Sequence, residues 1–118
     1  MQEMNYFPEG FACPCCGIED MDKDFVGRLN FARDKAGIPF ILRSAFRCPI
    51  WNAKVGGTKN SAHQFGYAVD LQVKDDRERW IIFVALFLSG FRRFGFGKDF
   101  IHVDEDPDKN PMRIWVYS

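Results

Sequence analysis

The chain has only two histidines, and each stands near a carboxylate in a setting that suits a metal ion. His63 is followed by Asp70, and His102 is followed by Asp104. Imidazole nitrogen and carboxylate oxygen both bind zinc, and a catalytic zinc usually takes three protein ligands and keeps a fourth position for water. We therefore predict a zinc site held by His63, Asp70 and His102. The competing interpretation is two unrelated histidines, each hydrogen-bonded within its own surroundings.

Two strand-like runs are expected to carry these side chains. Residues 67–73 alternate between apolar and polar types, so Asp70 projects from the face opposite the core. Residues 100–104 alternate in the same way, and His102 also points away from the core. Paired as neighbours, the two strands bring Asp70 and His102 to one ion, and the preceding loop brings His63.

The segment around the first histidine resembles a known peptidase signature. Residues 61–70 are similar to the S-x-H-x-x-G-x-A-x-D pattern of the M15 zinc peptidases, the group of D-alanyl-D-alanine carboxypeptidases and phage endolysins. His102 matches the later metal ligand of that family. Upstream, residues 44–61 resemble the S-x-x-R-C-P-x-x-N…V-G-G…N-S run of its short, phage-associated branch. The resemblance covers most of the chain after about residue 20.

The resemblance also implies a mechanism with a carboxylate base. Zinc lowers the pKa of a bound water toward roughly 7 and polarises the scissile carbonyl, while a carboxylate moves the proton to the leaving amine. The family places an acidic residue three positions before its last histidine ligand, where Asp99 stands. Asp99 departs from the Glu of the best-matched carboxypeptidases and has a shorter reach. Asp104 is the alternative base, or it orients His102 from behind.

Substrate-binding residues are expected upstream of the first ligand. Arg47 would offer a planar fork to a carboxylate or carbonyl of the substrate, with Ser44 supporting it and Ser61 also in contact with substrate. The simpler interpretation makes Arg47 an ordinary surface arginine.

The resemblance implies hydrolysis of a peptide bond that involves a D-amino acid, in the stem or cross-bridge of peptidoglycan. A carboxypeptidase would hold a terminal carboxylate with Arg47, whereas an endolysin would cut inside the stem. The alternative function is a non-catalytic, zinc-bearing binding or structural module of the same fold, such as a component of a phage particle.

Length and composition limit the other classes of function. The 118 residues include 47% apolar types and carry zero net charge, so we expect one folded domain, residues 1–118, and no nucleic-acid partner. The longest apolar run, residues 80–88, is too short to span a membrane and predicts a central, buried helix. Residues 1–10 have no basic residue and no apolar block, so we expect no secretory signal. A protein made in the cytoplasm would then need another factor to reach the cell wall.

Four cysteines remain outside this scheme, three of them in the irregular N-terminal segment, residues 1–20. Cys13 and Cys16 have C-x-x-C spacing, Cys15 lies between them, and Cys48 could join them. This arrangement permits a small structural zinc site or a disulfide, and reduced thiols are the third interpretation. Cys48 as a nucleophile would need a histidine base, and both histidines are better used on metal.

The expected architecture is α+β and similar to the hedgehog and DD-peptidase fold. A small antiparallel sheet carries the zinc site on one face, and helices pack on the other. Helix caps and breakers predict helices that begin after Asp20 or Asp22, at Pro49 and after Asp75, and a flexible lead before the last metal strand. The first helix is expected to run to about residue 36, followed by helices at 49–55 and 76–89, strands at 39–42, 67–73, 100–104 and 113–117, and the lead at 94–97.

Overall fold

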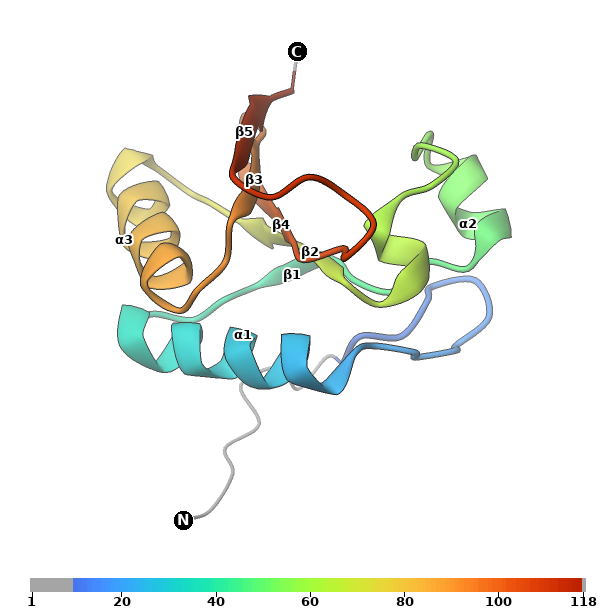
Figure 1. Ribbon diagram of the computed structural model, residues 1–118, viewed down its shortest axis with the longest axis horizontal. Coiled ribbons are helices and arrows are strands. Elements are labelled where there is room, and N and C mark those ends of the chain that lie inside the picture. Colours follow the sequence, from blue (N-terminus) through green and yellow to red (C-terminus); the bar gives the residue numbers. More distant parts are fainter. Residues whose placement is uncertain (1–9, 118) are drawn as a thin grey trace.

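A five-stranded sheet with the order β1-β2-β4-β3-β5 forms the centre of the molecule (Figure 1). The computed structural model describes residues 10–117, so the part of the expected irregular segment before residue 10 lies outside the described residues. The elements are α1 (Lys23–Ala36), β1 (Leu42–Ser44), α2 (Pro49–Lys54), the 3-10 turn η1 (Ala62–Phe65), β2 (Ala68–Gln72), α3 (Asp76–Leu88), β3 (Arg93–Phe96), β4 (Phe100–Asp104) and β5 (Arg113–Val116).

The sheet is mixed, because the strand pair at one edge is parallel. This corrects the expectation of a wholly antiparallel sheet. β1 with β2, β2 with β4 and β3 with β4 are antiparallel pairs. β5 pairs with β3 in parallel. After β4 the chain crosses β3 and forms β5 on the other side of β3. Because β5 is antiparallel to β4, it is parallel to β3. The α+β class itself is confirmed.

The two faces of the sheet have different roles. One face packs against α1 and α3, which lie together, while α2 stands at the other end of the molecule (Figure 1). The core between them contains the alternate residues of β2 and β4 and the inner faces of both helices. Its most completely buried members are Phe25, Leu29, Val69, Leu71, Ile82, Leu86, Phe91, Ile101 and Val103. The polar residues of the central strands therefore face away from this core.

Local sequence signals explain the two long helices. Asp22 caps α1 by accepting the backbone N–H of Phe25 at 2.9 Å, and Gly37 ends the helix with a φ of 69°. Asp75 caps α3 by accepting the N–H of Glu78 at 2.8 Å. These predicted boundaries are confirmed to within about a residue.

Three expectations need correction. The first strand is Leu42–Ser44, later than predicted, and the lead at 94–97 is mostly strand β3. The helix α3 is not central, because the side chains of Trp80 and Leu88 are 67% and 64% exposed. Only one side of this apolar helix meets the core. Within residues 10–117, no helix combines the length and apolar character needed to cross a bilayer.

Candidate metal centre and active site

Strand register and a tight turn bring the three predicted ligands together. Asp70 in β2 is the pairing partner of His102 in β4. His63 lies in η1, where its backbone N–H is 3.3 Å from the Ser61 hydroxyl oxygen that caps the turn. Gly66 ends the turn with a φ of 78°, and a Cβ there would lie 2.1 Å from a backbone oxygen. Only glycine fits this return of the chain into β2.

Both histidines use one ring nitrogen to contact the protein and turn the other toward Asp70. His63 Nδ1 lies 2.7 Å from the carbonyl oxygen of Ala45, so this nitrogen carries the proton and donates it. His63 Nε2 lies 3.4 Å from Asp70 Oδ1. His102 Nε2 lies 2.6 Å from Asp104 Oδ2, and its Nδ1 lies 2.9 Å from Asp70 Oδ1. Each ring is thereby held in one orientation.

With those protons on the outer nitrogens, three electron-pair donors face one another. One ligand atom from each of His63, Asp70 and His102 lies within 4.8 Å of the others. Unshared electron pairs this close repel each other unless a cation or a shared proton lies among them. Two imidazoles and a carboxylate are also a usual zinc ligand set. The residues present therefore fit the metal ion that the sequence predicts.

The charges of the site shift the pKa of each of these side chains. Burial alone would lower the pKa of His102, but its hydrogen bonds with Asp104 and Asp70 raise it above the ordinary value. Burial lowers the pKa of His63 against the opposing effect of Asp70. Burial would raise the pKa of Asp70, yet hydrogen bonds with both histidines hold it well below its usual range. A charged Asp70 and neutral histidines are the forms that bind metal, so an ion at this site would have to displace the extra proton that the raised pKa of His102 favours.

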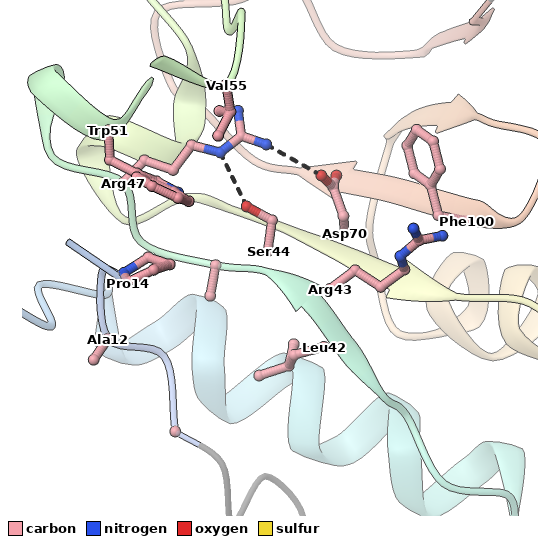
Figure 2. Close-up of a pocket in the computed structure, with 12 residues that line it drawn as sticks. Ala12, Pro14, Leu42, Arg43, Ser44, Arg47, Trp51, Val55, Asp70 and Phe100 are labelled. Atoms are coloured by element: carbon pink, nitrogen blue, oxygen red, sulfur yellow. Dashed lines mark hydrogen bonds and ion pairs between the residues drawn. The ribbon is translucent and has the colours of Figure 1, made fainter. Parts of the chain in front are cut away.

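Arg47 lies beside the three ligands and is not a solvated surface residue. Its side chain is 15% exposed, and its Nη2 lies 3.4 Å from Asp70 Oδ2, the oxygen turned away from His102. Nε donates to the Ser44 hydroxyl at 2.9 Å and Nη1 donates to Asn52 Oδ1 at 3.3 Å. Figure 2 shows the guanidinium reaching from the loop after β1 toward Asp70, with Ser44 below it.

Asp104 is buried behind His102 and its two oxygens are both engaged. Oδ2 accepts from His102, and Oδ1 accepts from Arg93 Nε at 2.6 Å. Burial would raise the pKa of Asp104, but the contacts with His102 and Arg93 lower it. The side chain of Arg93 is only 14% exposed. The structure thus adds Arg93 to the site.

Asp99 stands apart from this group. Its side chain is 62% exposed and its Oδ1 pairs with Arg43 Nη1 at 2.7 Å. The residue precedes Phe100 at a bend, so it lies at the edge of β4. The structure brings together every other residue predicted for the site but does not bring the carboxylate of Asp99 to the ligands.

A cavity of about 410 Å³ opens onto the ligands. It is lined by His63, Asp70, His102, Arg47, Ser61, Trp115 and Tyr117, among others. A neighbouring cavity of about 410 Å³ shares Arg47 and Asp70 with the first, and Ser44 and Pro14 line it (Figure 2). The ligands therefore lie along a groove that continues on both sides of Arg47.

Two further residues support the site, Trp115 in the groove wall and Asn52 beside Arg47. Trp115 lies with its ring centroid 5.5 Å from that of His102, so the last strand lines the groove as well as ending the sheet. Asn52 is 3% exposed and links Arg47 to the Thr58 carbonyl, to which it donates at 2.7 Å. The asparagine of the run at 44–61 was the available clue to that role.

Comparison with protein families agrees with this geometry. A family model described as Peptidase M15 matches residues 6–104, a range that holds all three ligand side chains. The chain belongs to the peptidase M15 family. No curated protein matches this M15 peptidase. Membership implies a metallopeptidase with a peptide substrate, in a family that generally depends on zinc.

Proposed function

We propose that this M15 peptidase is a zinc-dependent peptidoglycan hydrolase that cuts a bond involving a D-amino acid. The observation that carries the proposal is the convergence of His63 Nε2, His102 Nδ1 and Asp70 Oδ1 within 4.8 Å at the floor of an open groove. Bound zinc would polarise the substrate carbonyl and activate a water molecule. The family's resemblance to D-alanyl-D-alanine carboxypeptidases and phage endolysins supports the substrate class.

Arg47 is the proposed substrate anchor. A guanidinium has five N–H donors, and the contacts with Ser44, Asn52 and Asp70 use one each. The remaining donors are available to a carboxylate or carbonyl in the groove. Because the groove continues past Arg47 on both sides, the same residue can hold a terminal carboxylate or an internal carbonyl. Ser61, whose oxygen caps η1, contributes a hydroxyl to the same wall.

Asp99 is the proposed general base, with Asp104 as a positioning residue. Asp104 has no free oxygen, because His102 and Arg93 occupy both. The exposed pair between Asp99 and Arg43 is of the kind that contributes little stability, so the carboxylate can leave Arg43 and turn toward the groove. A base must come within hydrogen-bond reach of the water it deprotonates, and substrate-free geometry often lacks that contact.

One observation favours a second candidate, a non-catalytic zinc-bearing module. In the described part of the chain, the residues lining the two cavities around Arg47 include no carboxylate other than Asp70 and Asp104, and both are engaged. A binding module would keep the ligands and the groove but would not need a base.

Digestion of purified peptidoglycan distinguishes the two functions. We expect new amino groups to appear with zinc and to cease with a chelator, and mass analysis of the fragments to identify the bond. The variant D99N should lose most turnover and keep its zinc, because general base catalysis contributes about 100-fold to 10,000-fold. The variant R77K, changed on the outer face of α3, is the matched control. Zinc binding without turnover in the wild-type protein would support the binding module instead.

A further inference from the structure

The four cysteines form a second cluster of metal-binding side chains, on the far side of Arg47 from the histidines. One sulfur atom from each of Cys13, Cys15, Cys16 and Cys48 lies within 4.8 Å of all the others. Cys15 Sγ is 3.6 Å from Cys13 Sγ and 3.2 Å from Cys48 Sγ. Four sulfurs around a tetrahedral zinc ion, at the usual bond length, stand about 3.8 Å apart. The cluster thus has nearly the size of a four-thiolate site.

The backbone around the cluster is arranged to donate to sulfur. The N–H of Cys48 points at Cys13 Sγ at 3.4 Å, and that of Trp51 points at Cys48 Sγ at 3.4 Å. The backbone of Cys15 also bonds to Cys13 Sγ, and that of Ile18 bonds to Cys16 Sγ. Hydrogen bonds from amides favour the charged thiolate form. The sulfurs of Cys13 and Cys48 therefore accept backbone hydrogen bonds of the kind that favours a thiolate.

A tight turn creates this arrangement in the N-terminal segment. Cys13 donates its backbone N–H to the Ile18 carbonyl at 2.8 Å, and Gly17 donates to the Cys13 carbonyl at 2.9 Å. Gly17 has a φ of 75°, which suits glycine. The turn folds the C-x-x-C run back on itself, so that both of its terminal sulfurs point to one side. Segment 10–20 contains no helix or strand and is attached to the rest of the molecule through the buried side chains of Phe11 and Cys13.

We propose that Cys13, Cys15, Cys16 and Cys48 bind a second zinc ion in a structural site, separate from the site of the histidines. A closed set of four sulfur ligands leaves no position for water, which is typical of structural rather than catalytic zinc. On binding, each ligand thiol gives up its proton to solvent, the four sulfurs coordinate the ion, and no electron is transferred. The thiolate set prefers a soft ion such as zinc over magnesium or calcium.

The second ion would fix the position of Arg47. Cys48 directly follows Arg47, and the backbone N–H of Phe46 donates to the Phe11 carbonyl at 3.1 Å, so the N-terminal segment lies along this loop. Pro14, between two of the cysteines, lines the cavity next to Arg47 (Figure 2). The ion would thus join the N-terminal segment to the loop that presents the substrate anchor, forming one wall of the groove.

Metal content and the spectrum of the cobalt-substituted protein test the proposal. The probe is Co²⁺ alone, added to wild-type protein freed of metal under reducing conditions. We expect sulfur-to-cobalt charge-transfer absorption, which imidazole and carboxylate ligands do not give. It should persist in H63A and disappear in C16S, and C16S should contain one zinc ion fewer than wild type. The variant R77K, changed on the exposed outer face of α3, is the control.

Two further measurements use the wild-type protein and so do not depend on whether a variant folds. In the wild-type protein, bound zinc should slow alkylation of the four thiols, and a chelator should restore fast alkylation. Intact mass without reductant should show no loss of hydrogen. A mass lower by two hydrogens would show a disulfide and overturn the proposal, as would cobalt spectra without a sulfur band. Loss of zinc from H63A with the sulfur band intact would isolate this site from the proposed catalytic one.

Discussion

At the candidate metal centre, each predicted ligand has a second contact that fixes its orientation. The Ala45 carbonyl holds His63, Asp104 holds His102, and Arg47 holds the outer oxygen of Asp70. Metal binding would leave these contacts intact, because they use the outer nitrogens of the histidines and the outer oxygen of Asp70, whereas the inner atoms would face the ion. Partners of this kind set the affinity for metal almost as strongly as the ligands do.

The contact between Asp104 and His102 gives the first prediction. The variant D104N places an amide where the ring N–H needs an acceptor and removes the charge that Arg93 neutralises. We expect zinc affinity to fall about 10-fold to 100-fold, with turnover restored at saturating zinc. Competition with a coloured chelator measures the affinity. If D104N binds zinc normally but stays inactive at saturation, Asp104 is the base instead.

Arg47 gives a prediction that concerns substrate binding, whereas the prediction for Asp104 concerns zinc affinity. In R47K, one ammonium replaces a fork that reaches Ser44, Asn52 and Asp70 at once, so the anchor loses its fixed direction. We expect kcat/KM on peptidoglycan fragments to fall by about 10-fold to 100-fold even at saturating zinc, where the zinc content should equal that of wild type. Steady-state kinetics alongside metal analysis gives both values. R77K again serves as the control, and a kcat/KM equal to that of wild type would remove Arg47 from substrate binding.

At the scale of elements, β5 completes the groove through a close approach to β3. A Cβ on Gly95 would lie 2.5 Å from Trp115 Nε1 and 2.6 Å from a ring carbon of Tyr117. Glycine is usually unfavourable in a strand, but here the two rings cover it and meet His102. The absence of a Cβ at Gly95 therefore allows the rings of Trp115 and Tyr117 to pack against β3 and line the groove.

The variant G95A should push both rings away from β3. We expect a loss of about 1–3 kcal/mol in the free energy of unfolding, as for overpacked cores, and a rise in KM with little change in kcat. Chemical denaturation and kinetics measure the two effects. The matched control is G27A on the exposed side of α1, where an added Cβ meets nothing within 4 Å. It should stabilise the protein by about 0.5–1 kcal/mol. An unchanged stability and KM in G95A would contradict this packing.

Sequence predicted these elements unevenly, and the reasons are physical. Caps and alternation are local, so α1, α3, β2 and β4 followed from Asp22, Asp75 and the period of the strands. The strand β3 was missed because Gly95 lowers strand propensity, and only the distant ring of Trp115 compensates. Likewise, nothing near Arg93 in sequence reveals that Asp104 is its partner.

For the whole molecule, the core and the metal centre occupy opposite faces of one sheet. The core is formed by α1, α3 and the inner face of β2 and β4, and Phe25 of α1 makes a T-shaped pair with Phe91, in the loop after α3, at a centroid distance of 5.5 Å. The groove side has less apolar packing, because its walls are loops, α2 and the edge strand β5. Polar contacts, together with metal ions at the two proposed sites, would therefore order the groove side of the folded state.

Metal removal should accordingly lower the stability of the whole domain. An ion that binds only the folded chain stabilises it by about 4 kcal/mol at a concentration 1,000 times its Kd. For a domain of this size, that corresponds to a Tm shift on the order of 10–20 °C. We expect a chelator to lower Tm by this amount and zinc to restore it, measured by circular dichroism under reducing conditions. Because the two proposed sites lie in different parts of the groove wall, H63A and C16S should each keep part of the decrease in Tm that a chelator causes. A Tm that does not respond to chelator in the wild-type protein would mean that neither cluster holds an ion in the folded state.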